Sequence, residues 1–99
     1  MSFEQMINSD KPVLVDFFAT WCGPCKTMAP VLKEVKAAVG DAASIIKVDV
    51  DKNQASARQF EVQGVPTFLL FKKGKLLWRQ SGVIPKATLI NLIHQHSNT

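Results

Sequence analysis

The stretch Val13-Leu-Val-Asp-Phe-Phe-Ala-Thr-Trp-Cys-Gly-Pro-Cys25 decides the fold. Its first six residues are apolar except for Asp16, a composition typical of a strand buried on both faces of a sheet. Apolar side chains then recur at helical intervals as far as Val39, and Gly40 follows as a residue that ends helices. The sequence therefore predicts a buried strand that leads through a Cys-X-X-Cys turn into the longest helix, with a kink at Pro30.

Helical and strand patterns alternate through the rest of the chain. Ser2 and Gln5 form a capping box ahead of a short opening helix, and Pro85 fits the first turn of a last helix. Gly74 permits the tight turn of an antiparallel hairpin, and Asn53 stands where it can cap a short helix. The further elements are expected at residues 44–50 (strand), 53–60 (helix), 67–71 (strand) and 76–80 (strand), before a tail that frays from His96.

Length and composition place the chain among ordinary globular proteins. Its 99 residues are too few to divide, so we expect a single domain over residues 1–99. The net charge of +4 comes without one basic run, which argues against nucleic-acid binding, and no apolar run is near the length of a membrane span. The first residues lack a secretory signal and both cysteines lie in one Cys-X-X-Cys, so we expect a reducing compartment, the cytoplasm.

The two cysteines lie between the buried strand and the start of the long helix. Unpaired N–H groups and the helix dipole stabilise an anion at that place, so the thiolate of Cys22 is favoured over its thiol and Cys22 is the expected nucleophile. Cys25 can reach the same sulfur, and we expect it to be the resolving thiol, more buried and harder to ionise. Pro24 is tolerated between them because its missing N–H would be unpaired in a first turn.

Several separated motifs resemble the thioredoxin family over nearly the whole chain. The residues that carry the resemblance are Val15-Asp-Phe-Phe-Ala19, Trp21-Cys-Gly-Pro-Cys25, Pro30, Lys47 with Asp49, Gly64-Val-Pro-Thr67 and Gly82. The resemblance implies the thioredoxin fold, an α/β architecture with a mixed sheet flanked by helices on both faces. Because the opening helix begins at Ser2, we expect the family's first strand to be absent, which leaves four strands in the order 44–50, 13–18, 67–71, 76–80.

By that resemblance the reaction is dithiol-disulfide exchange on protein substrates. Cys22 attacks a substrate disulfide and Cys25 resolves the mixed disulfide, without a metal or a bound cofactor. The implied electron donor is an NADPH-dependent flavoprotein, thioredoxin reductase. We expect a monomer, or a weak dimer through strand 44–50, because the absent first strand leaves that strand at an edge.

Asp16 is the candidate base for Cys25. Its apolar neighbours should desolvate the carboxylate and raise its pKa toward the range in which it exchanges protons at neutral pH. Lys47 resembles the family's lysine beside that carboxylate and would offset the cost of burial. The pattern alone also permits an Asp16 that faces solvent at a strand edge.

A second group of residues is expected to hold the substrate. The family places a cis proline opposite the cysteines, here Pro66, whose missing N–H leaves an edge free for an extended segment held through Val65. The expected docking residues are Trp21, Gly23, Pro24, Gly64, Val65, Pro66, Thr67, Gly82 and Val83.

The sequence departs from the family at Phe18, where many members carry Trp, an apolar exchange that the chemistry should survive.

Three rival interpretations stay open. The fold could serve as a binding module with incidental thiols, Cys22 and Cys25 could bind zinc with His94 and His96, or the pair could act as an oxidant, which a reduction potential near about −120 mV would indicate.

Overall fold

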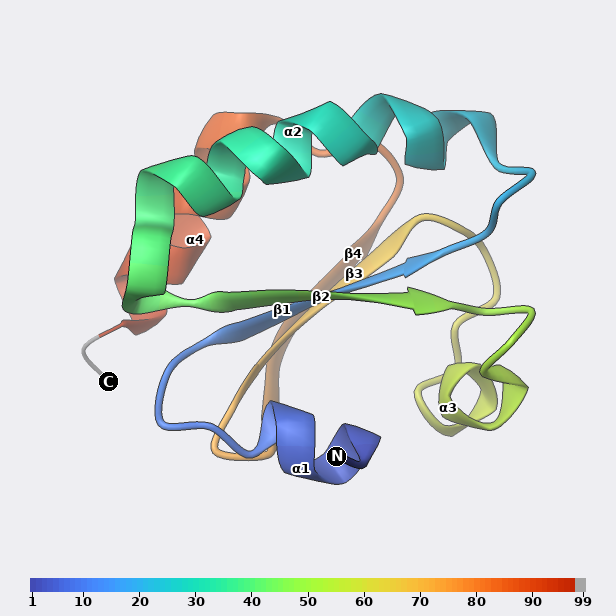
Figure 1. The fold of residues 1–99 in the computed structure, drawn as a ribbon, viewed down its shortest axis with the longest axis horizontal. Helices are drawn as coiled ribbons and strands as arrows, with labels where there is room; N and C mark the ends of the chain where they lie inside the picture. Colours follow the sequence, from blue (N-terminus) through green and yellow to red (C-terminus); the bar gives the residue numbers. More distant parts are fainter. Residues whose placement is uncertain (98–99) are drawn as a thin grey trace.

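A mixed four-stranded sheet forms the centre of the computed structural model, which describes residues 1–97 (Figure 1). The strand order is β2-β1-β3-β4, as predicted. β1 pairs in parallel with β2 and antiparallel with β3, and β3 pairs antiparallel with β4. No strand precedes β1 within residues 1–97. The strands are β1 (Val13–Phe18), β2 (Ser44–Asp49), β3 (Thr67–Lys72) and β4 (Lys75–Ser81).

Helices cover both faces of this sheet, as the resemblance implied. In Figure 1 the long helix that follows β1 and the last helix lie on one face, and the opening helix and the short helix before β3 lie on the other. The pair on the first face is α2 (Gly23–Val39) and α4 (Lys86–His96), and the pair on the second is α1 (Phe3–Ile7) and α3 (Gln54–Gln59). A single 3-10 turn, η1 (Gly40–Ala42), links α2 to β2.

β1 divides two apolar cores because its side chains alternate between the faces. Leu14 packs with Met28 and the other buried residues of α2 and α4, whereas Val15 and Phe17 pack with the residues of α1 and of the opposite face. The same alternation directs Asp16 to the α2 side of the sheet. A buried carboxylate therefore lies on the same side of the sheet as this apolar core.

Local signals in the sequence account for most element boundaries. Ser2 and Gln5 form both hydrogen bonds of the capping box, and Gly74 adopts the positive φ (80°) that the hairpin turn requires. α2 continues through Pro30, so the kink there stays a prediction. Asn53 occupies the N-cap position of α3 but makes no capping hydrogen bond. The predicted cap is wrong because the Asn53 Nδ2 donates to the Asp49 carbonyl oxygen at 3.0 Å instead.

The expected fraying from His96 is also wrong at its first residue. α4 includes His96, whose carbonyl oxygen accepts a hydrogen bond from the Lys72 Nζ at 2.8 Å. A cation at the C-terminal end of a helix stabilises its last turn. Ser97 is the C-cap residue of α4, and its Oγ donates to the Ile93 carbonyl oxygen at 2.7 Å. Residues 98–99 of the predicted tail lie outside the described residues.

Candidate active site

The two cysteines form a disulfide at the N-terminus of α2. Cys22 is the N-cap residue and Cys25 belongs to the first turn, with a Cα–Cα distance of 5.3 Å. The Cys22 Sγ accepts a hydrogen bond from the Cys25 backbone N–H at 3.1 Å. The sulfur thus takes the place of the side-chain oxygen that usually caps a helix, where an N–H group and the positive end of the helix dipole favour negative charge.

Burial does not separate the two cysteines. Cys22 is 4% exposed and Cys25 is 6% exposed, so the prediction that Cys25 is the more buried is wrong for the disulfide form. Their bond holds both sulfurs in one small cluster with Ala19, against which Phe18, Val50 and Val65 pack. What distinguishes Cys22 is its position at the cap.

Asp16 is buried on the α2 side of β1, with 1% of its surface exposed. The alternative in which it faces solvent is therefore wrong. Burial raises the pKa of its carboxyl group to about 6, while the positive charge of Lys47 opposes that rise. Its Oδ1 has no hydrogen-bond partner among the described residues. A carboxyl group in this state exchanges protons near neutral pH.

Lys47 lies opposite Asp16 in the parallel register of β1 and β2. Its side chain is exposed, and its Nζ lies 5.0 Å from the centroid of the Phe18 ring, a cation-π distance. Lys47 and Cys25 line the same surface hollow. The structure thus brings the predicted lysine close to both the carboxylate and the second cysteine.

The loop before β3 forms the other wall of the site. The Val65–Pro66 peptide bond is cis, as predicted. The Thr67 hydroxyl donates to the Gly64 carbonyl oxygen at 2.6 Å, and the Gly82 N–H donates to the Pro66 carbonyl oxygen at 2.9 Å. The first bond closes the loop on itself, and the second connects it to the other predicted docking segment at Gly82.

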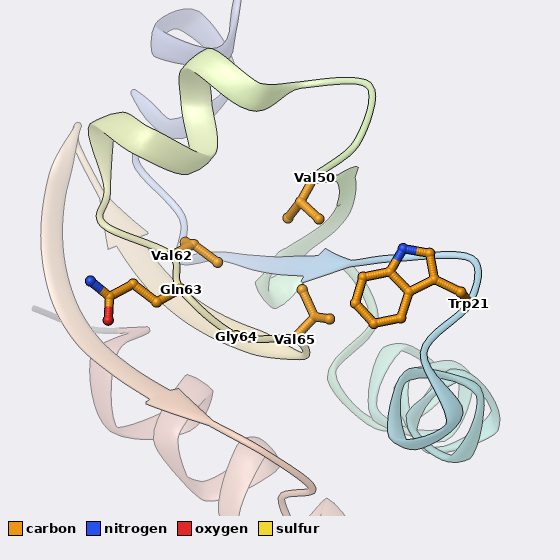
Figure 2. Close-up of a pocket in the computed structure, with 6 residues that line it drawn as sticks. All are labelled: Trp21, Val50, Val62, Gln63, Gly64 and Val65. Atoms are coloured by element: carbon orange, nitrogen blue, oxygen red, sulfur yellow. The ribbon is translucent and has the colours of Figure 1, made fainter.

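Trp21 closes an apolar hollow of about 110 Å³ beside this loop. Its indole points toward Val65, with Val50 next to both (Figure 2). Although Trp21 is 69% exposed, its Nε1 donates to the Asp51 Oδ2 at 2.9 Å, which fixes the ring. The six residues that line the hollow are Trp21, Val50, Val62, Gln63, Gly64 and Val65.

The remaining predicted docking residues do not line this hollow, and two of them, Pro66 and Thr67, are buried. Gly23 and Pro24 are exposed in the first turn of α2, and Val83 is exposed beyond Gly82. Sequence reasoning missed Val50, Val62 and Gln63. Val50 had a usable signal, because it directly follows a strand parallel to β1 and must emerge at the same sheet edge as the cysteines.

Two further properties follow from the described residues. Residues 1–97 contain no group of three or more His, Cys, Asp or Glu side chains placed to hold a metal ion, so the zinc interpretation finds no ligand set in them. No helix in this part of the chain is long and apolar enough to cross a membrane.

Comparisons with known proteins agree with this geometry. The family model named Thioredoxin matches residues 1–95. The chain belongs to the thioredoxin family. It is 48% identical over 91 residues to a thioredoxin of Haemophilus influenzae, an alignment that covers 92% of this chain and 85% of the relative. It is 46% identical over 93 residues to a chloroplastic thioredoxin of Arabidopsis thaliana, which covers 93% of this chain and 56% of that protein.

Solved structures of thioredoxins have the same fold. The thioredoxin of Malassezia sympodialis superposes with a TM-score of 0.86 at 40% identity, covering 96% of this chain and 85% of that one. Family membership together with the cysteine pair at the start of α2 makes this thioredoxin-family chain a thiol-disulfide oxidoreductase of the protein-disulfide reductase type.

Proposed function

We propose that Cys22 is the attacking thiol and Cys25 the resolving thiol in the reduction of protein disulfides. The observation that carries this assignment is the Cys22 Sγ at the helix cap, where it accepts the Cys25 N–H. In the reduced protein the same donor and the helix dipole favour a thiolate at Cys22.

The reaction proceeds in two exchanges that conserve atoms and electrons. The Cys22 thiolate attacks one sulfur of the substrate disulfide, the other sulfur leaves and takes up a proton, and a mixed disulfide forms. Cys25 then loses its proton and attacks the Cys22 Sγ, which releases the second substrate thiol. The substrate gains two electrons, and the protein is left with the Cys22–Cys25 bond seen in the structure.

Asp16 receives the proton of Cys25 in this proposal. The positive charge of Lys47 favours the ionised form of that carboxylate. Support comes from the buried Oδ1 without a partner and from the carboxyl pKa of about 6. A base of this pKa is partly protonated and partly ionised near neutrality, which suits proton exchange at that pH.

The apolar hollow and the cis-proline loop hold the substrate segment. Pro66 has no backbone N–H, and the exposed Gly64 lets another backbone approach closely. Trp21 and Val65 supply apolar contacts next to Cys22, while Gly82 and Val83 extend the surface on the β4 side. An extended segment is recognised mainly through main-chain atoms, which suits a reductase with many protein substrates.

The proposed electron donor is an NADPH-dependent flavoprotein, thioredoxin reductase, and the proposed compartment is the cytoplasm, with roles in electron transport and redox homeostasis. The bacterial relative supports this placement, whereas the chloroplastic relative shows that the family also serves another compartment. We also propose one domain over residues 1–99 that is monomeric, with a weak dimer through the exposed edge of β2 as the alternative.

The two cysteine roles predict opposite outcomes for serine variants. Cys22→Ser should abolish reduction of insulin disulfides, because no mixed disulfide can form. Cys25→Ser should instead accumulate a covalent complex with the substrate, which mass spectrometry of the non-reduced mixture detects. A binding module would retain its activity in Cys22→Ser, and the reverse pattern of trapping would overturn the assignment.

Asp16→Asn tests the base. We expect slower resolution near neutral pH with the first attack comparatively intact, measured by stopped-flow decay of the mixed disulfide. Resolution rates equal to those of the unaltered protein from about pH 6 to about pH 9 would remove this role from Asp16.

The equilibrium potential against glutathione separates reductase from oxidant, since a value near about −120 mV would indicate the oxidant.

A further inference from the structure

A second groove lies on the opposite side of the disulfide from the apolar hollow. It consists of two surface hollows of about 220 and about 210 Å³ that share Ala29 and Lys47 and are therefore adjacent. The first is lined by Cys25 and Lys26, and the second runs on between α2 and β2 to Lys36. The groove thus begins at the resolving cysteine and follows the outer side of α2.

Lysines make up most of the polar lining of this groove, with Thr20 beside them. The four that line it are Lys26, Lys33, Lys36 and Lys47, all exposed. No aspartate or glutamate among residues 1–97 lines either hollow. The floor between the lysines is aliphatic and aromatic, formed by Phe18, Ala29, Leu32 and Ile45.

Two of the four positive charges are held in place by the fold. The Lys36 Nζ donates to the carbonyl oxygens of Gly40 and Ala43 at 2.8 and 2.9 Å. Lys47 rests over the Phe18 ring. Charges that are already ordered lose less conformational entropy when a ligand binds, so this groove is better prepared for an anion than a set of freely rotating lysines.

The nearby carboxylates do not line the groove, although the charge of Asp16 interacts with that of Lys47. Glu34, on α2, pairs with Lys86 of α4 at 3.6 Å and so belongs to another side of the helix. Asp49, two residues after Lys47, accepts the Asp51 N–H at 2.9 Å in the turn after β2. Asp16 lies buried below the sheet surface and does not line the groove.

We propose that this lysine groove docks an acidic, extended segment of a partner protein, with carboxylates toward Lys26, Lys33 and Lys47 and an aliphatic side chain on the floor between them. The ten helical steps from Lys26 to Lys36 rise about 15 Å along α2, the length of about five residues of extended chain. A second copy of this chain fits poorly, because its charge of +4 repels the same lysines.

The position of the groove links docking to the chemistry. A segment that flanks a substrate disulfide can pass over Cys25 into the groove while the disulfide itself meets Cys22. This link rests on the proposed function, whereas the binding site does not, since a cysteine-free peptide can test it. The partner class is therefore a protein whose target disulfide, or redox-active pair, is flanked by an extended segment that combines acidic and aliphatic residues.

Binding of a cysteine-free peptide to the disulfide form of the protein tests the site. The probe is a six-residue Glu-Leu-Glu-Glu-Leu-Glu segment, followed by amide chemical shifts, with Gln-Leu-Gln-Gln-Leu-Gln as its neutral match. We expect shifts at Ala29, Lys33 and Ile45 with the acidic peptide only. Lys33→Glu should weaken its binding roughly fivefold, while Lys75→Glu, an identical charge change on the hairpin, should weaken it less than about twofold.

The proposal would be overturned by shifts centred on Trp21 and Val65, by equal weakening in both variants, or by equal binding of the neutral peptide. Shifts at the groove that depend on protein concentration without peptide would assign it to a second copy and would also overturn it. Joining each peptide to a disulfide loop then tests the link to chemistry, with faster reduction expected for the acidic one at low salt. If neither loop is reduced but the peptide binds at the groove, the proposed function fails and the docking site stands.

Discussion

The two sides of the Cys22–Cys25 disulfide offer a partner different kinds of contact. On one side, Trp21, Val65 and their neighbours form a small hollow with no charged residue in its lining. On the other, four lysines border a longer groove. Apolar contacts near a main-chain edge tolerate many sequences, whereas charge contacts discriminate between partners. The comparison suggests that general recognition and partner selection occupy separate sides of one redox centre.

The largest effect is expected on stability, from Asp16, which lies on the same side of the sheet as the lysine groove. The pKa of its carboxyl group is about 6 in the folded chain against 3.8 as the reference, so the folded state binds this proton more tightly than the unfolded state. Stability is therefore fully present below about pH 4 and falls as pH rises to about 6. The loss amounts to about 3 kcal/mol, an order-of-magnitude figure.

Asp16→Asn removes this loss because the amide carries no charge. We expect the variant to be more stable than the unaltered protein above pH 7 by roughly 1–3 kcal/mol, with a flat profile between about pH 4 and about pH 6. Urea unfolding across this pH range measures the difference, and Asp51→Asn on the exposed surface serves as the control. If the dependence of stability on pH were the same in Asp16→Asn, another group would be responsible for the titration between about pH 4 and about pH 6.

The next largest effect is expected on substrate binding at the apolar hollow, from Trp21→Ala. Loss of an exposed, fixed aromatic ring at the centre of a docking surface typically costs about 1–2 kcal/mol in binding, or roughly tenfold in KM. We expect this rise for insulin but not for a small disulfide such as oxidised glutathione, which leaves most of the hollow empty. Equal losses for both substrates would indicate damage to the cysteines instead of lost docking.

Arg79 should give a smaller effect on the same side. Its guanidinium donates to the carbonyl oxygens of Phe60 and Glu61 at 2.6 and 3.3 Å, and so fixes the end of α3 from which residues 62–65 lead to the hollow. Arg79→Ala should lower stability by about 1 kcal/mol and raise KM for insulin roughly threefold, with kcat retained. Arg79→Lys keeps a donor and should recover part of the loss. An unchanged KM in a destabilised Arg79→Ala would make this contact purely structural.

The smallest effect concerns the charge of Lys47. Its ammonium group opposes the rise in the Asp16 pKa, so Lys47→Gln should move that pKa further upward from about 6. Titration of the Asp16 carboxyl carbon by NMR measures the shift, with Lys33→Gln as a matched control that lies further along the groove. A shift of equal size in both variants would mean that the overall charge, not the register of β1 and β2, sets the effect.

The sequence contained the information for the elements and for most of the catalytic side. The almost continuous apolar run of β1 was enough to predict a buried strand, but it left open whether Asp16 faces solvent, and the resemblance to the family favoured the buried position. The residues of the hairpin turn were enough to predict an antiparallel pair. The strand order came from the resemblance to the family, because periodicity does not say which strands are neighbours. Local patterns were misleading where a side chain had two uses, as with Asn53, whose amide turns back to Asp49.

Both sides of the disulfide were harder to predict because they are built from distant segments. The apolar hollow joins Trp21 to Val50 and Val62, and the lysine groove joins α2 to β2. Separation in the sequence hides such neighbours. The relative burial of the two cysteines was also beyond the sequence, since it depends on how the disulfide sits against the packed residues around Ala19.

The β3–β4 turn holds segments near both ends of the chain. The Lys73 and Gly74 N–H groups donate to the Ser9 and Ile7 carbonyl oxygens at 2.7 and 3.1 Å, and Lys72 contacts the end of α4. This turn lies at the opposite end of β3 from the cis proline. A fluorescent protein or an affinity tag fused at either end should therefore lie away from the redox centre. The centre should then stay as accessible to large partners as in the isolated chain.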